Sequence, residues 1–135
     1  MRLLIDANII LDVLQKREPH YTDSSIVWKI CETGQADGFV SSLTVANLVY
    51  VMRKELDAEQ IEDVITKLKL IFNIADFTAS DLAKAAEMKW SDFEDAVQSA
   101  IAERIQADFI ITRNVRDYLK SKVMAFTPSE FIARQ

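Results

Sequence analysis

Short apolar runs that alternate with amphipathic stretches constrain the fold of this chain more than any other feature. The apolar runs are residues 1–5, 39–40, 72–74, 107–112 and 123–126. Between them, apolar residues recur three and four positions apart, which is the spacing of one face of a helix. Strands that alternate with helices predict a parallel sheet covered on both faces. We therefore expect an α/β fold with three layers, α/β/α, and a central, mainly parallel sheet of about five strands.

Capping residues mark the ends of several predicted helices. Gly34 is a candidate cap at the end of a helix over 21–33, and Asp57 is placed to begin another. Ser91 and Glu94 have the spacing of a capping box at the start of a later helix. This spacing predicts that Glu94 stabilises the helix and does not take part in chemistry.

Length and composition point to one domain. We expect residues 1–135 to form a single domain, because 135 residues is an ordinary domain size and two glycines and two prolines leave little room for linkers. The apolar runs are far shorter than the roughly 20 residues of a membrane span. Asp6 interrupts the apolar N-terminal run before it could serve as a signal peptide, and the single Cys31 excludes an internal disulfide. The expected location is the cytoplasm, with no membrane association.

The charge of the chain leaves nucleic acid open as a partner. A net charge of −5 argues against binding through bulk positive charge. However, carboxylates gathered around a divalent ion would supply much of that negative count. Four basic residues also fall close together, namely Arg113, Arg116, Lys120 and Lys122.

Aspartates stand at the edges of several predicted elements. Asp6 closes the first apolar run, Asp92 and Asp95 open a helical stretch, and Asp117 follows the run that ends at Thr112. A carboxylate at the tip of a buried strand is costly to desolvate unless a metal, a cation or water is nearby. Strand tips of a parallel sheet converge at one edge, which is the usual place for a site. The pattern predicts an acidic metal-binding cluster, and such a metal points to phosphate chemistry.

Each of these residues also has a purely structural interpretation. Asp6 and Asn8 are good helix caps, and a strand-end Asp also occurs in phosphatases and response-regulator receivers. Asp92 could simply favour the positive end of a helix dipole. Asp95 is harder to explain in this way, since it shares a helix face with Asp92 and a divalent cation would remove their repulsion.

The segment after the run 107–112 offers further oxygen ligands. Thr112, Asn114 and Asp117 can each orient a ligand or a water, although a polar turn alone would explain them. With one histidine, His20, and one cysteine, the usual zinc ligands are not present. All-oxygen ligation predicts Mg²⁺ or Mn²⁺.

Taken in order, four segments resemble the PIN-domain ribonucleases, and the resemblance covers nearly the whole chain. The segments are Leu4–Asp12, Ser41–Asn47, Asp92–Ala100 and Ile110–Tyr118. Many proteins that this chain resembles look like VapC-type toxins, which cut RNA and are silenced by an antitoxin partner. The resemblance therefore implies a PIN-like domain with RNA as substrate, an antitoxin protein as partner and a homodimer.

The resemblance carries over unevenly to the four acidic positions of the family. Asp6 matches the first and Asp95 the third, whereas the second falls on Asn47 and the fourth on Asn114. Asp92 and Asp117 are near enough in the sequence to substitute. An asparagine oxygen can bind a metal or its waters but supplies no negative charge, so we expect ion affinity to fall unless Asp92 compensates.

The leading hypothesis is a metal-dependent endoribonuclease, the toxin of a type II toxin–antitoxin pair. Its catalytic residues would be Asp6, Asp92, Asp95 and Asp117, and the first three of these would hold Mg²⁺ or Mn²⁺. The supporting polar residues would be Asn8, Thr44, Asn47, Thr112 and Asn114. Arg113 and Arg116 would contact RNA phosphates, giving affinity without sequence choice.

Two other functions remain open. One is a PIN-like RNA-binding or protein-interaction module that has lost catalysis, which Asn47 and Asn114 favour. The other is a phosphatase or receiver built on Asp6, although no downstream Lys of a receiver can be placed. For the homodimer, an apolar stripe from Thr44 through Leu70 could supply the interface, although such a stripe is more often part of a core.

Overall fold

The computed structural model describes all 135 residues and contains one five-stranded sheet. Every strand pairing is parallel, and the strand order is β3-β2-β1-β4-β5. The strands are β1 (Arg2–Ile5), β2 (Asp37–Ser41), β3 (Asn73–Ala75), β4 (Phe109–Ile111) and β5 (Met124–Phe126). This confirms the predicted α/β class and the number of strands.

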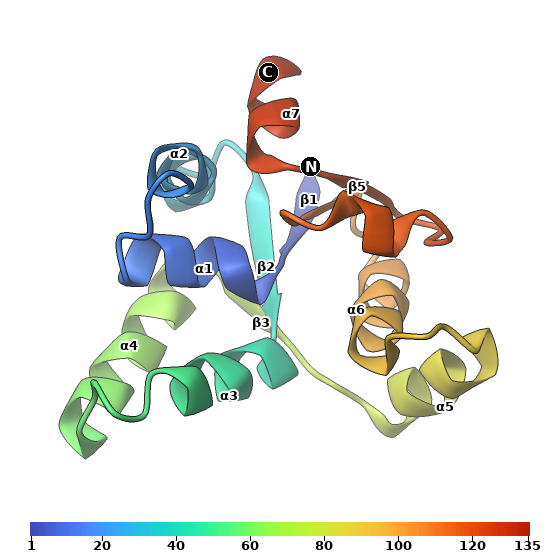
Figure 1. Cartoon of the computed structure of the whole chain (residues 1–135), viewed down its shortest axis with the longest axis horizontal. Helices are drawn as coiled ribbons and strands as arrows, with labels where there is room; N and C mark the ends of the chain where they lie inside the picture. The colour runs from blue at the N-terminus through green and yellow to red at the C-terminus, as the bar shows by residue number, and fades with distance from the viewer.

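Seven α-helices and one 3₁₀ helix surround the sheet (Figure 1). They are α1 (Ala7–Leu14), α2 (Tyr21–Glu32), α3 (Ser42–Val51), α4 (Ala58–Ile71), α5 (Ala79–Met88), α6 (Phe93–Arg104), η1 (Val115–Tyr118) and α7 (Pro128–Ala133). Figure 1 shows α1 to α4 on one side of the strands and α5 and α6 on the other. No helix has the length and apolar character needed to cross a membrane.

Two apolar clusters fill the space between the layers. Successive side chains of β1 point to opposite faces of the sheet and so enter different clusters. Leu3 and Ile5 belong to one cluster, and Leu4 belongs to the other. The larger cluster joins the sheet to α1, α2, α3, α4 and α7, and the smaller one joins it to α5 and α6. Strands covered on both faces explain why the apolar runs in the sequence are continuous.

The apolar stripe proposed as a dimer interface is mostly core. Val45, Leu48, Met52 and Leu68 are all buried, so they cannot meet a second copy. Apolar side chains exposed in this region are instead Tyr50, Val51 and Leu70.

Most of the predicted caps are confirmed, and one is wrong. Asp57 caps α4, and Gly34 takes a left-handed conformation just after α2, with φ 79°. The capping box of Ser91 and Glu94 is not formed, because α6 begins one residue later and Asp92 is its N-cap. The Asp92 carboxylate accepts the N–H of Asp95 at 3.1 Å, and its charge also suits the positive end of the helix.

The strand order gathers polar residues at one edge of the sheet. From β1 at the centre, the chain builds β2 and β3 on one side and then crosses to β4 and β5 on the other. The carboxyl ends of parallel strands beside such a reversal form a crevice in α/β proteins. Asp6, Thr112 and Thr127 each come directly after a strand at this edge.

Candidate functional site

The register between β1 and β4 places Asp6 beside Thr112. Ile5 pairs with Ile111, so the next residue of each strand lies at the same level. The Thr112 hydroxyl donates to Asp6 Oδ2 at 2.7 Å, while Asp6 Oδ1 accepts the N–H of Ala7 at 2.8 Å. Asp6 therefore caps α1 and also stands at the carboxyl edge of the sheet, so its structural and functional interpretations are compatible.

The surroundings of Asp6 oppose its ionisation. Burial raises the pKa of the Asp6 carboxyl above its ordinary value, and the negative charge of Asp117 adds to this effect. The hydrogen bonds from Thr112 and Ala7 and the positive charge of Arg113 work in the opposite direction.

Asp95 lies in the same field of negative charge. Burial raises its pKa to about 6, with further contributions from Asp92, Asp117 and Asp6. The Tyr118 hydroxyl donates to Asp95 Oδ1 at 3.2 Å and holds that carboxylate toward η1. The structure thus brings together the four predicted aspartates from β1, α6 and η1.

A cleft of about 250 Å³ opens onto three of these acids. Asp92, Asp95 and Asp117 line it together with Arg116 and Lys120. None of the four aspartates lies within ion-pairing distance of a basic side chain. Asp6 and Asp95 are partly buried, whereas Asp92 and Asp117 are exposed. Neighbouring carboxylates without a paired cation would favour an added positive charge.

Glu94, next to the acids of α6, makes a contact that the sequence analysis did not predict. Its carboxylate accepts a hydrogen bond from Asn47 Nδ2 at 2.6 Å, which joins α6 to α3. The predicted capping box assigned the Glu94 side chain to the start of its own helix and not to a contact with α3. The available signal was its place between Asp92 and Asp95 in the first turn of a helix.

The supporting polar residues divide into two groups. The N–H of Asn114 donates to the Thr112 hydroxyl at 3.1 Å, and Asn8 lies half-buried two residues after Asp6. In contrast, Thr44 is buried and its N–H and hydroxyl both bond to Ser41, so Thr44 holds the start of α3 and does not face the acids. Its expected role in placing ligands is therefore not supported by its contacts.

Arg113 has a partner that the sequence did not reveal. Its Nε lies 3.6 Å from Oδ2 of Asp12, a fully buried residue of α1 that also accepts a 2.9 Å hydrogen bond from Ser24 Oγ. About a quarter of the Arg113 side chain is exposed, and its Nε is near Asp12 without forming a hydrogen bond to it. Arg116 is exposed and lies in the acidic cleft.

The donor set has the chemistry of a hard cation site. Asp6, Asp95 and their neighbours offer oxygen atoms only, which suits Mg²⁺ or Mn²⁺. Burial and mutual repulsion oppose the ionisation of these acids, and a divalent cation would relieve that penalty. As the side chains stand, no three Asp, Glu, His or Cys residues are arranged as ligands of one ion.

Comparison with known proteins agrees with the fold. Ribonuclease VapC1 of Aquifex aeolicus (strain VF5) is 23% identical over 138 residues, which covers 98% of this chain and 94% of that protein. The structure of FitAB bound to an IR36 DNA fragment superposes with a TM-score of 0.73 at 20% identity, covering 93% of this chain and 94% of that one. VapBC-1 from nontypeable Haemophilus influenzae superposes with a TM-score of 0.72 at 17% identity, covering 96% and 99%. The PIN domain family model matches residues 2–116, and the chain therefore belongs to the PIN domain family.

Proposed function

We propose that this protein is a divalent-metal-dependent endoribonuclease and the toxin of a type II toxin–antitoxin pair. The observation that carries the proposal is the meeting of Asp6, Asp95, Asp92 and Asp117 at the carboxyl edge of the sheet without paired cations. Membership of the PIN domain family and the likeness to a protein named Ribonuclease VapC1 support the choice of RNA.

Asp6 and Asp95 would hold Mg²⁺ or Mn²⁺, with Asp92 and Asp117 adding negative charge. A bound ion of this kind would lower the pKa of a water and offset the charge that develops on the phosphate. The hydroxyls of Thr112 and Tyr118 keep the two central carboxylates in fixed orientations. A carboxylate oxygen has more than one lone pair, so each can accept such a bond and still act as a ligand.

Glu94 would supply the charge that Asn47 lacks. The family resemblance places its second acid at Asn47, and the Glu94 carboxylate lies 2.6 Å from the Asn47 amide. The same contact lets Asn47 orient a carboxylate that could reach the ion or one of its waters.

Exposed basic side chains would meet the RNA backbone. Arg116 and Lys120 line the acidic cleft and can contact phosphates without reading sequence. Because Asp12 engages Arg113, we assign Arg113 a smaller share of this binding.

The proposed protein partners are an antitoxin and a second copy of the chain. Structures of the same fold include a toxin–antitoxin complex from Klebsiella pneumoniae, with a TM-score of 0.71 at 20% identity. Exposed Tyr50, Val51 and Leu70 offer apolar surface for a homodimer.

A second candidate function is an RNA-binding or protein-interaction module without catalysis. Asn114 favours it, because this residue stands where the resemblance places an acid and its side chain is exposed.

Calorimetric titration with Mn²⁺ separates the two functions. We expect wild type to bind the ion and both Asp6→Asn and Asp95→Asn to lose binding while they keep the fold. Asp63→Asn removes one exposed carboxylate from α4 and serves as the charge-matched control. An RNA cleavage assay on the same variants then tests catalysis. Wild-type cleavage by Asp6→Asn would refute the proposed site, and absence of ion binding in wild type would favour the non-catalytic module.

A further inference from the structure

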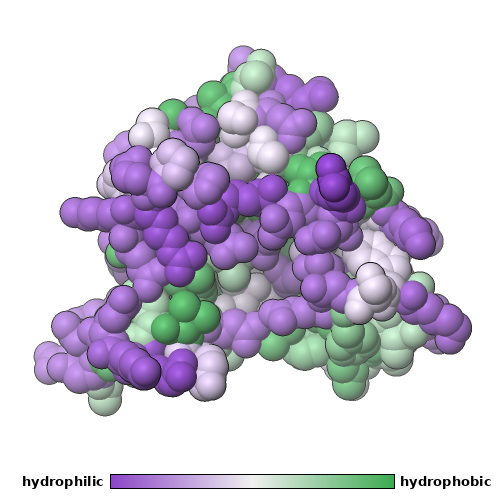
Figure 2. All heavy atoms as spheres, viewed as in Figure 1, coloured by the Kyte–Doolittle hydropathy of each residue, from purple (hydrophilic) through white to green (hydrophobic).

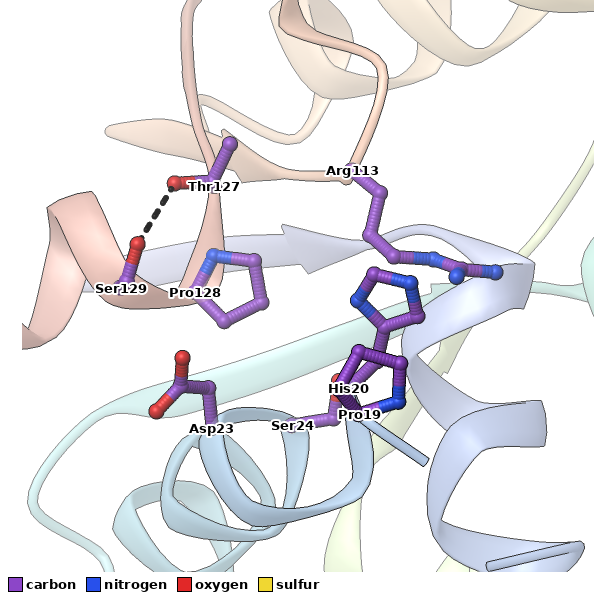
Figure 3. A pocket seen from close by; sticks show the side chains of 8 residues that line it. All are labelled: Pro19, His20, Asp23, Ser24, Arg113, Thr127, Pro128 and Ser129. Atoms are coloured by element: carbon purple, nitrogen blue, oxygen red, sulfur yellow. Dashed lines mark hydrogen bonds between the residues drawn. The ribbon is translucent and has the colours of Figure 1, made fainter. Parts of the chain in front are cut away.

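A second polar cavity lies at the same edge of the sheet as the acidic cleft and shares no lining residue with it. It has a volume of about 230 Å³ and lies where the start of α2 approaches the segments that follow β4 and β5 (Figure 3). Arg113 forms one wall, and its neighbour Thr112 holds the Asp6 carboxylate. The cavity is therefore one residue along the chain from the proposed centre.

The charges around the cavity do not suit a phosphate group. Arg113 faces the buried Asp12 carboxylate at 3.6 Å, and Asp23 contributes a second negative charge to the lining. A phosphate would meet a cation whose charge is partly offset by Asp12 and a carboxylate, Asp23, that repels it. A neutral ligand with hydrogen-bonding groups is the better match.

The shape of the lining favours a flat ring. Pro19, His20 and Pro128 contribute rings, and Figure 3 shows the Arg113 guanidinium beside the His20 ring. Unpaired RNA bases stack on planar groups such as the His20 imidazole and the Arg113 guanidinium. At about 230 Å³ the cavity is smaller than the roughly 300–1,000 Å³ of pockets for drug-sized ligands, which suits one base.

Asp23 would select among the bases. Figure 3 shows its carboxylate on the opposite side of the cavity from His20, near Ser129. A carboxylate accepts hydrogen bonds only, and guanine alone presents two adjacent N–H donors on its Watson–Crick edge. The Ser129 hydroxyl can donate or accept next to it.

We propose that this cavity binds a guanine base of single-stranded RNA next to the bond that the acidic centre cuts. The inference rests on the proposed ribonuclease function for its substrate class. It adds a sequence preference, set by Asp23, to a centre whose phosphate contacts carry none.

Binding of the four nucleoside 5′-monophosphates, followed by ¹⁵N NMR, tests the proposal without any cleavage. The phosphate and sugar are common to all four probes, so a difference in affinity reports the base. We expect guanosine monophosphate to bind at least about tenfold more tightly than the others and to shift the amide signals of His20, Asp23 and Ser129. Asp23→Asn should remove this preference, while Asp63→Asn should keep it.

Three results would overturn the proposal. The first is equal affinity for the four nucleotides, which a phosphate subsite would give. The second is an absence of amide shifts at the cavity. The third is a guanine preference that survives Asp23→Asn. Failure of the ribonuclease function is distinguishable, because guanosine monophosphate would still bind while wild type neither bound Mn²⁺ nor cut RNA.

Discussion

The side-chain amide of Asn47 donates a 2.6 Å hydrogen bond to the carboxylate of Glu94. The two residues lie 47 positions apart, on α3 and in the first turn of α6. This contact brings a negative charge to a position where the sequence alone offers an amide. It also means that the two asparagines at family acidic positions are not equivalent, since Asn114 has no such neighbour among its hydrogen-bond partners.

Replacing Glu94 by Gln tests whether this carboxylate supports an ion. We expect Mn²⁺ affinity to fall by about 10-fold to 100-fold, the range for loss of a group that orients or supports metal ligands. Titration calorimetry measures the change, and Glu62→Gln, an exposed change on α4, is the matched control. Unchanged affinity in Glu94→Gln would mean that Glu94 serves only the contact with Asn47.

The Thr112 hydroxyl should matter more for the site than for the fold. Thr112→Val keeps the shape of a fully buried side chain but removes the donor to Asp6. We expect the free energy of unfolding to fall by about 1 kcal/mol and the pKa of Asp6 to rise further, with weaker Mn²⁺ binding at neutral pH. Thr112→Ser keeps the hydroxyl and should bind Mn²⁺ like wild type. Equal ion binding by the Val and Ser variants would contradict this role.

The raised pKa of Asp95 predicts a specific dependence of stability on pH. Its ordinary value is 3.8, and burial followed by the charge of Asp92 raises it to about 6. Between these values Asp95 binds more protons in the folded protein than in the unfolded chain, so its contribution to the free energy of unfolding should fall as pH rises from 3.8 to about 6. Mn²⁺ affinity should rise over the same interval, because the ion requires the ionised carboxylate.

Chemical denaturation at a series of pH values measures this effect. Asp95→Asn carries no titratable group at this position, so its stability should change less across the interval. An Asp95→Asn profile equal to that of wild type would contradict the assignment.

Asp12 and Arg113 should be energetically coupled. Asp12→Ala leaves the Arg113 guanidinium without its carboxylate and the Ser24 hydroxyl without its acceptor. We expect the free energy of unfolding to fall by about 1–3 kcal/mol. This is less than for breaking a fully buried pair, because Arg113 is partly exposed. A double-mutant cycle with Arg113→Met measures the coupling, and additive effects of the two changes would show that the pair contributes nothing.

Gly38 is required by close packing against α2 and the end of α4. A Cβ atom at this position would lie 2.6 Å from Cys31 Sγ and 2.8 Å from Phe72 Cδ1. We expect Gly38→Ala to lower the free energy of unfolding by about 1–3 kcal/mol. Thermal denaturation measures this loss. The same Gly38→Ala change made in a Cys31→Ala background should cost less stability, and an equal cost in both backgrounds would show that the clash is not with Cys31.

The fold class and the sheet edge that carries the candidate site could be predicted from the residue pattern. Continuous apolar runs such as Leu3-Leu4-Ile5 predict strands buried on both faces, and the structure covers both faces of β1 with helices. Parallel strands place their carboxyl ends together, so the sequence alone predicts that Asp6 and the residues after β4 lie at one edge of the sheet.

The contacts between polar side chains could not be predicted from the residue pattern. Ser91 and Asp92 are both good caps, and the sequence could not say which residue begins α6. With Asp92 as the cap, the Glu94 side chain contacts Asn47 on α3. The packing of α1 against the segment after β4 brings Arg113 close to Asp12. Periodicity reports which face of an element is buried, whereas contacts between polar side chains depend on how distant elements are positioned in space.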